Sequence, residues 1–104
     1  MAAQSGIRNC GLSFLGASDT DWNLMGSTGN RTWAKLITFP TQFSTLPSVT
    51  VSIAGFHIIE GESARLSVGV GLVETTGFWV QIQTWGDTQV AGVAVQWLAY
   101  DNLL

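Results

Sequence analysis

Cysteine and histidine each occur once in this chain of 104 residues, as Cys10 and His57. A single cysteine forms no disulfide within the chain, so we expect a free thiol, buried as a small apolar residue. His57 has Glu60 and Glu62 nearby, but no spacing supplies the further ligands or the nucleophile that a metal or acid–base site requires. We therefore expect His57 to be a loop residue, and we expect no enzyme activity, no metal and no cofactor.

Charged side chains are also scarce. They make up 11% of the residues, against 46% hydrophobic residues, and the net charge is −3. The four basic residues form no stripe that could neutralise phosphates, which argues against nucleic acid as a partner. We find neither an apolar run of membrane-spanning length nor a charged segment followed by an apolar one at the N-terminus. The compartment stays open, and we expect no membrane insertion and either a cytoplasmic location or release by a non-classical route.

Apolar and polar residues alternate with a period of two along most of the chain. This alternation predicts strands over residues 3–9, 32–39, 48–56, 64–74, 77–85 and 91–100. The segment 11–31 is rich in glycine, aspartate, asparagine and serine, which predicts a long loop. The expected fold is all-β, a six-stranded antiparallel β-sandwich, with a single domain over residues 1–104.

Two of these strands combine an apolar side with a side of small or amide residues. The apolar side consists of Leu66, Val68, Val70 and Leu72 in one strand and Phe78, Val80, Ile82 and Thr84 in the other. The opposite side consists of Arg65, Ser67, Gly69, Gly71, Trp79, Gln81, Gln83 and Trp85. A surface so poor in long side chains suits a subunit interface packed around a symmetry axis. The alternation of residues alone leaves open the alternative that this side is a solvent-exposed sheet face with scattered tryptophans.

The last quarter of the chain reads as a hairpin. An apolar run opens at Gly77, the residues 84–88 (Thr-Trp-Gly-Asp-Thr) make a turn, and a second apolar run covers 93–97. Trp85 is thereby placed at the tip, beside Gly86 and Asp87. A large, rigid and amphipathic ring next to a polar turn is suited to stack on the apolar face of a sugar or on a partner protein.

These residues, together with residues 4–6 (Gln-Ser-Gly) and 34–39 (Ala-Lys-Leu-Ile-Thr-Phe), resemble the H-type lectins. That family comprises snail agglutinins and the C-terminal domains of slime-mould discoidins, and the resemblance covers nearly the whole chain. It implies a lectin active in agglutination and cell adhesion that binds glycans of the galactose or N-acetylgalactosamine type. The sites are expected to be shared between protomers of a homotrimer, with a hexamer of two trimers left open.

The resemblance extends to single positions of the sugar site. Gly26, Arg65 and Trp85 match the loop glycine, the strand arginine and the tryptophan of the family. Three positions depart, because Thr28 stands where a carboxylate is expected, Gly86 replaces a histidine and Ala91 replaces a tyrosine. If the loop alignment shifts, the Asn30 amide takes the task of that carboxylate, since it both donates and accepts hydrogen bonds. The expected sugar-binding residues are Gly26, Thr28, Asn30, Arg65, Trp85, Gly86 and Asp87.

The three departures support an alternative function. In this interpretation the chain is a non-enzymatic trimeric attachment or structural module whose sugar pocket has degenerated. The trimer is the same in both interpretations, so glycan binding is the property that separates them.

Overall fold

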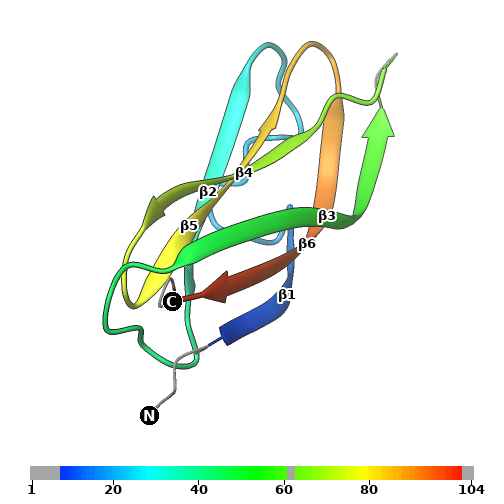
Figure 1. Cartoon of the computed structure of the whole chain (residues 1–104). Coiled ribbons are helices and arrows are strands. Elements are labelled where there is room, and N and C mark those ends of the chain that lie inside the picture. The colour runs from blue at the N-terminus through cyan, green and yellow to red at the C-terminus, as the bar shows by residue number, and fades with distance from the viewer. Residues whose placement is uncertain (1–7, 61–62, 102–104) are drawn as a thin grey trace.

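A computed structural model describes residues 8–60 and 63–101 of the chain (Figure 1). It contains six strands: β1 (Arg8–Gly16), β2 (Arg31–Thr38), β3 (Ser48–Glu60), β4 (Ser67–Val73), β5 (Gly77–Thr84) and β6 (Gln89–Tyr100). They form two three-stranded sheets, sheet A in the order β1-β6-β3 and sheet B in the order β2-β5-β4. Every pairing is antiparallel. The all-β antiparallel sandwich is confirmed, and no membrane-spanning helix occurs in the described ranges.

Four aromatic rings fill one part of the space between the two sheets. The ring of Phe39 lies 5.1 Å from that of Phe43 and 5.9 Å from that of Trp97, and the ring of Phe78 lies 5.5 Å from that of Trp97. The segment carrying Phe39 and Phe43 is tied to the β4–β5 turn, because their amides donate to carbonyls of that turn at 2.9 and 3.0 Å. Large rings buried in this way account for much of the hydrophobic stabilisation of a small domain.

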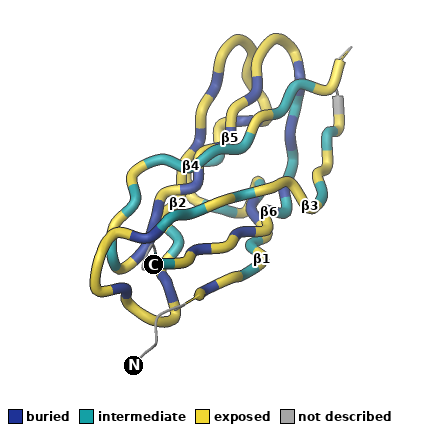
Figure 2. The backbone as a smooth tube through the Cα atoms, in the orientation of Figure 1, coloured by how far each residue is buried: buried dark blue, intermediate teal, exposed yellow. Residues whose placement is uncertain are grey.

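The alternation predicted for β5 is confirmed. Phe78, Val80, Ile82 and Thr84 are almost completely buried, and the residues between them are exposed, as the alternating colours along β5 show (Figure 2). Trp85 follows at the hairpin tip, as expected. The outer face of sheet B is therefore the small-chained surface that the sequence indicated.

In β4 the predicted parity holds only as far as Val70. Val70 pairs with Val80, but the next pair joins Val73 to Phe78, so β4 has one residue more than β5 between the two pairs. This bulge reverses the parity of the strand. Leu72, which was expected in the core, is 63% exposed, and Val73 packs against the core instead. The prediction for Leu72 was wrong.

Two segment boundaries also differ from the predicted ones. Residues 3–7 of the first expected strand lie outside the described residues, and β1 runs from Arg8 to Gly16, so the long loop begins at Ala17 rather than at residue 11. Pairing with β6 continues as far as Gly16 opposite Gly92, which keeps this glycine in the strand. β3 likewise continues beyond the predicted end to Glu60, alongside β6.

Cys10 and His57 are both placed differently than expected. Cys10 is exposed, because its neighbour Asn9 points inward and donates from Nδ2 to the carbonyl of Thr41 at 2.9 Å. Successive side chains of a strand point to opposite faces, so Cys10 points out. His57 is an exposed residue of β3 rather than of a loop, since β3 follows β6 past this point.

The close pairing of β2 with β5 predicts that Gly77 does not tolerate a side chain. A Cβ atom there would overlap the carbonyl oxygen of Ile37 and lie 3.2 Å from the Cα of Thr38. Gly77→Ala should therefore lower the free energy of unfolding by about 1 to 3 kcal/mol through backbone displacement. Gly55→Ala is the matched control, because its Cβ would meet only the Ala94 Cβ at 3.9 Å. Equal losses for both variants in urea unfolding would contradict the packing described.

Candidate functional site

Three chain segments meet at one end of sheet B. The loop 17–30 leads into β2, residues 63–66 lead into β4, and the turn 85–88 connects β5 to β6. They are brought together by strand pairing, since Arg31 lies opposite Thr84 and Ser67 lies opposite Gln83. The segments that carry the expected sugar-binding residues therefore converge, although up to about 60 positions separate them in the sequence (Figure 1).

The buried side chain of Arg31 joins two of these segments. Arg31 is only 7% exposed, and its guanidinium donates to the carbonyls of Gly29 at 2.9 Å, Leu24 at 3.2 Å and Gly86 at 3.1 Å. Burying a charged group is costly unless its donors are hydrogen-bonded, so these three carbonyls are held in place. In the sequence alone, Arg31 is only one of four basic residues. Arg31 lies two positions before the buried Trp33 in β2, so the alternation of the strand indicates that both side chains point inward.

Gln89, the first residue of β6, fastens the same loop to the turn from the other side. Its Oε1 accepts from the amide of Gly26, and its Nε2 donates to the carbonyl of Ser27 at 2.7 Å. The amide of Gly29 also donates to the carbonyl of Gly86 at 2.9 Å. Gly26 and Gly29 have φ angles of 86° and 83°, which L side chains rarely adopt, so the loop requires glycine at both positions. Sequence reasoning missed Gln89, and no sequence motif marks it.

At this end of sheet B, Arg65 of the segment before β4 forms an ion pair with Asp87 of the turn 85–88. The Nη1 of Arg65 donates to Oδ1 of Asp87 at 3.0 Å and to Oγ1 of Thr88 at 3.3 Å. The backbone beneath is fixed, because Oγ1 of Thr84 donates to the carbonyl of Arg65 at 2.5 Å. The side chains of Arg65 and Asp87 are 29% and 53% exposed, so the pair contributes little to stability and remains open to a ligand.

Gly86 leaves the space that Arg65 occupies. A Cβ atom at position 86 would lie 2.7 Å from Nη1 of Arg65, and the φ angle of 69° disfavours any side chain there. A histidine at this position would have to displace the guanidinium. The glycine and the pairing of Arg65 with Asp87 are thus two parts of one arrangement.

Trp85 borders a small hollow on the outer face of sheet B. The ring is 42% exposed, and the hollow has a volume of about 240 Å³. It is lined by Asn30, Arg31, Thr32, Gln83, Thr84 and Trp85. An aromatic face beside amide and hydroxyl groups can stack on an apolar ligand surface while hydrogen-bonding to its rim.

All seven expected sugar-binding residues lie in the three segments at this end. Gly26, Thr28 and Asn30 are in the loop, Arg65 precedes β4, and Trp85, Gly86 and Asp87 form the turn. Thr28 is exposed, and the carboxylate that does stand beside Arg65 is that of Asp87. No group of three or more potential metal ligands occurs among the described residues.

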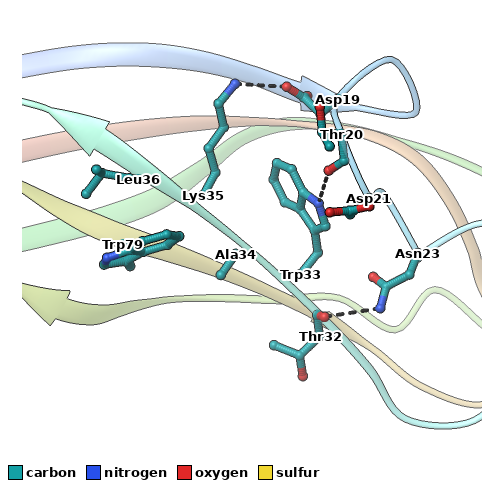
Figure 3. Close-up of a pocket in the computed structure, with 10 residues that line it drawn as sticks. All are labelled: Asp19, Thr20, Asp21, Asn23, Thr32, Trp33, Ala34, Lys35, Leu36 and Trp79. Carbon is teal, nitrogen blue, oxygen red and sulfur yellow. Dashed lines mark hydrogen bonds and ion pairs between the residues drawn. The ribbon is translucent and has the colours of Figure 1, made fainter.

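A larger hollow, of about 590 Å³, lies farther along the outer face of sheet B (Figure 3). Exposed Leu36 and Trp79 form one side, and the loop residues Asp19, Thr20, Asp21 and Asn23 form the other. The loop side is fixed to β2, because Nε1 of Trp33 donates to the carbonyl of Thr20 at 3.0 Å and Lys35 pairs with Asp19 at 2.8 Å. The hydrogen bond from Lys35 and one from the amide of Gly16 lower the pKa of Asp19 below its ordinary value. No pattern in the sequence indicates this hollow.

Comparison of the sequence with known proteins gives matches of two kinds. The profile of the H-type lectin domain matches residues 34–100. A protein of Fuscovulum blasticum, described as ATP synthase subunits region ORF 7, is 35% identical over 78 residues, which are 73% of this chain and 68% of the relative.

Two solved structures of discoidin II of Dictyostelium discoideum share the fold. Their TM-scores are 0.81 and 0.77, at 21% and 20% sequence identity, and each superposition covers 97% of this chain. The present chain spans 40% and 39% of the length of those discoidin chains. At this identity the likeness concerns the fold.

The three hydrogen bonds of Arg31 predict that lysine cannot replace it. Lysine keeps the charge but lacks the planar fork, so buried carbonyls lose their donors. Arg31→Lys should lower the free energy of unfolding by about 1 to 3 kcal/mol and speed hydrogen exchange at the amide of Gly29. Arg8→Lys, at an exposed position, is the control and should leave both unchanged. Unchanged exchange at Gly29 in Arg31→Lys would show that the guanidinium does not hold the loop.

Proposed function

Since this chain belongs to the H-type lectin family, we propose that it is a lectin for galactose or N-acetylgalactosamine, with sites shared between the protomers of a homotrimer. Membership of the family supports a carbohydrate-binding role. The type of sugar and the trimer are the parts that we propose.

The observation that carries the proposal is the convergence of Arg65, Asp87 and Trp85 at one end of sheet B. Sugar hydroxyls both donate and accept hydrogen bonds. A guanidinium supplies donors in a fixed fork, a carboxylate supplies acceptors, and hydrogen bonds to charged groups are about twice as strong as neutral ones. In the proposed trimer the exposed ring of Trp85 from a neighbouring protomer adds a stacking surface for the apolar side of a pyranose. Together these groups match the chemistry of a sugar ring.

Asp87 is proposed to replace the carboxylate that position 28 lacks. It lies 3.0 Å from Arg65, and residues 86–89 are tied to the loop by Arg31 and Gln89. A ligand hydroxyl can donate to the carboxylate of Asp87 while Arg65 donates to a neighbouring oxygen. Asn30 adds an amide at the rim of the hollow beside Trp85. The preference for a particular sugar then follows from Asp87 rather than from Thr28.

The proposed trimer packs through the outer face of sheet B. This face combines small residues such as Gly69 with exposed apolar ones, since Leu36 and Trp79 are 43% and 36% exposed. Trp85 lies at the end of the same face, so a neighbouring protomer packed there would receive its ring. The hollow beside Trp79 would be covered by the same contact. Repetition of the site around an axis would raise the avidity of weak single sites.

One observation, the departures from the family at three positions, supports the alternative that the chain is an attachment module. Thr28, Gly86 and Ala91 stand where the family has side chains that contact sugar, and Thr28 is exposed. In that case Arg65 and Asp87 only stabilise the hairpin turn. The trimer would persist without a functional pocket.

Sugar binding is predicted to need both Arg65 and Trp85. Alanine at either position should weaken binding of N-acetylgalactosamine by about 1 to 3 kcal/mol, roughly 10- to 100-fold, because an unpaired or unstacked group remains. Titration calorimetry on intact trimers measures this loss, and Arg8→Ala is the control at an exposed arginine. Asp87→Asn should weaken binding in the same range.

Two gain-of-function variants complete the test. Thr28→Asp and Asn30→Asp restore a carboxylate to the loop and should strengthen binding of galactose-type sugars. If neither the wild type nor these variants bind any sugar on a broad glycan array, the lectin proposal fails and the attachment module takes its place.

The trimer predicts a sensitive position at Gly69. Within one protomer a Cβ at Gly69 would meet nothing within 4 Å, so substitution should leave the protomer fold intact. At a subunit interface, however, an unpaired carboxylate is costly to bury. Gly69→Asp should therefore separate the protomers of the trimer and lower the mass of the assembly threefold in light scattering, with the protomers still folded, whereas Ser44→Asp in an exposed loop should not. A wild-type protein that is monomeric at micromolar concentration would overturn the shared site.

A further inference from the structure

We propose that β1 is a contact between two copies of this chain, in which two β1 strands pair antiparallel about a twofold axis that passes beside Leu12. The proposal concerns sheet A and does not depend on sugar binding. It rests on the open edge of the strand, on the regularity of that edge and on the pattern of its side chains.

The edge of β1 that faces away from β6 is open. β1 pairs with β6 over all nine residues from Arg8 to Gly16, and no described strand pairs with its other edge (Figure 1). Only its C-terminal end is closed, because the amide of Gly16 donates to Oδ2 of Asp19 at 2.8 Å. A strand of nine residues presents a row of backbone donors and acceptors about 30 Å long.

The other edge strands of the sandwich carry features that discourage pairing. β3 has three register shifts against β6, and β4 has one against β5. The edge of β2 carries Lys35 and is lined by the loop, since Nδ2 of Asn23 donates to the carbonyl of Thr32 at 3.3 Å. Bulges, lysines and covering loops are the usual protections of sheet edges. Within the described residues β1 has such features only at its two ends, the charge of Arg8 and the contact of Gly16 with Asp19, and its register with β6 is unbroken.

Three outward side chains of β1 are apolar and are arranged symmetrically about Leu12. Cys10, Leu12 and Phe14 point out of sheet A, and Leu12 and Phe14 are 51% and 76% exposed. With Leu12 opposite Leu12 of the second copy, Cys10 faces Phe14 and Arg8 faces Gly16. Every outward apolar side chain then meets an apolar partner, and the two arginines stay apart.

Other registers of the same strand fit less well. Centring the pair on Cys10 places Leu12 against Arg8, and centring it on Phe14 places Leu12 against Gly16. A second copy is therefore the partner that satisfies both the backbone edge and the side chains, as a self-complementary twofold contact requires. The proposed trimer contact uses the outer face of sheet B, whereas β1 is an edge strand of sheet A, so the two contacts do not compete and this one joins protomers of two different trimers.

The register can be tested by crosslinking. Directly opposed residues of antiparallel strands have Cα atoms about 4.5 to 5.5 Å apart, which is within the range for a disulfide. Phe14→Cys should form covalent dimers with native Cys10 of the second copy under mild oxidation, seen on a non-reducing gel. The wild type should not, because two Cys10 residues would lie about 13 Å apart along the paired strands.

The control is Phe14→Cys combined with Cys10→Ser. Positions 14 of the two copies are also about 13 Å apart in the proposed register, so this double variant should remain uncrosslinked. Crosslinking of the double variant or of the wild type to the same extent as Phe14→Cys would overturn the register. Absence of crosslinking in Phe14→Cys would overturn the contact.

The mass of the assembly in solution distinguishes pairing through the edge of β1 from association through the whole apolar outer face of sheet A. Leu12→Lys places a charge at the centre of the proposed contact and should halve the mass of the assembly in light scattering. Leu98→Lys makes the same change on β6, where Leu98 is 38% exposed on the same face but does not lie on the edge. Equal masses for Leu12→Lys and the wild type, or an equal loss with Leu98→Lys, would contradict edge pairing.

Discussion

The geometry of the site depends on one buried charge. A guanidinium removed from water must be hydrogen-bonded, and Arg31 meets this requirement with three carbonyls, those of Leu24, Gly29 and Gly86. Two of these carbonyls belong to the loop before β2 and one to the turn after β5. Solvating the charge therefore fixes two segments relative to each other. The rigid base of the site is a consequence of placing an arginine on the core side of a strand.

On this base the exposed groups are held much more loosely. Arg65 and Asp87 pair at the surface, where an ion pair is worth little because water screens it. Their backbone carbonyls, in contrast, accept hydrogen bonds from Thr84 and Gln89, and Arg31 holds the carbonyl of Gly86, the residue before Asp87. A binding site benefits from this combination, since the positions of the groups are set in advance and their mutual bond is cheap to exchange for bonds to a ligand.

Much of the fold could be predicted because its strands follow a strict period of two. The hairpin with Trp85 at its tip and the inward face of β5 were predicted from that period alone. The errors arose where a long-range constraint overrides the period. The extra residue in β4 exposes Leu72, pairing with β6 keeps Gly16 in β1, and the inward turn of Asn9 exposes Cys10.

The candidate site was predictable in its members but not in its connections. The resemblance to H-type lectins indicated Arg65 and Trp85, and the turn indicated Asp87. Nothing local to the sequence shows that Asp87 pairs with Arg65, because the two are 22 positions apart and meet only through the register of β4 and β5. The role of Arg31 has the same origin, since two of its three acceptors are neighbours in sequence and the third is 55 positions away.

The core and the open edge of β1 are also linked. Gly11 lies opposite Trp97, and a Cβ at Gly11 would come within 2.8 Å of the indole ring, so this ring packs directly on the strand backbone. A bulge in β1 would shift Gly11 out of register and bring a side chain against Trp97, which is 6% exposed within the aromatic cluster. β1 therefore cannot contain a bulge of the kind that interrupts β3 and β4 without disturbing the core. The regularity that leaves its edge free to pair follows from the packing of a tryptophan behind it.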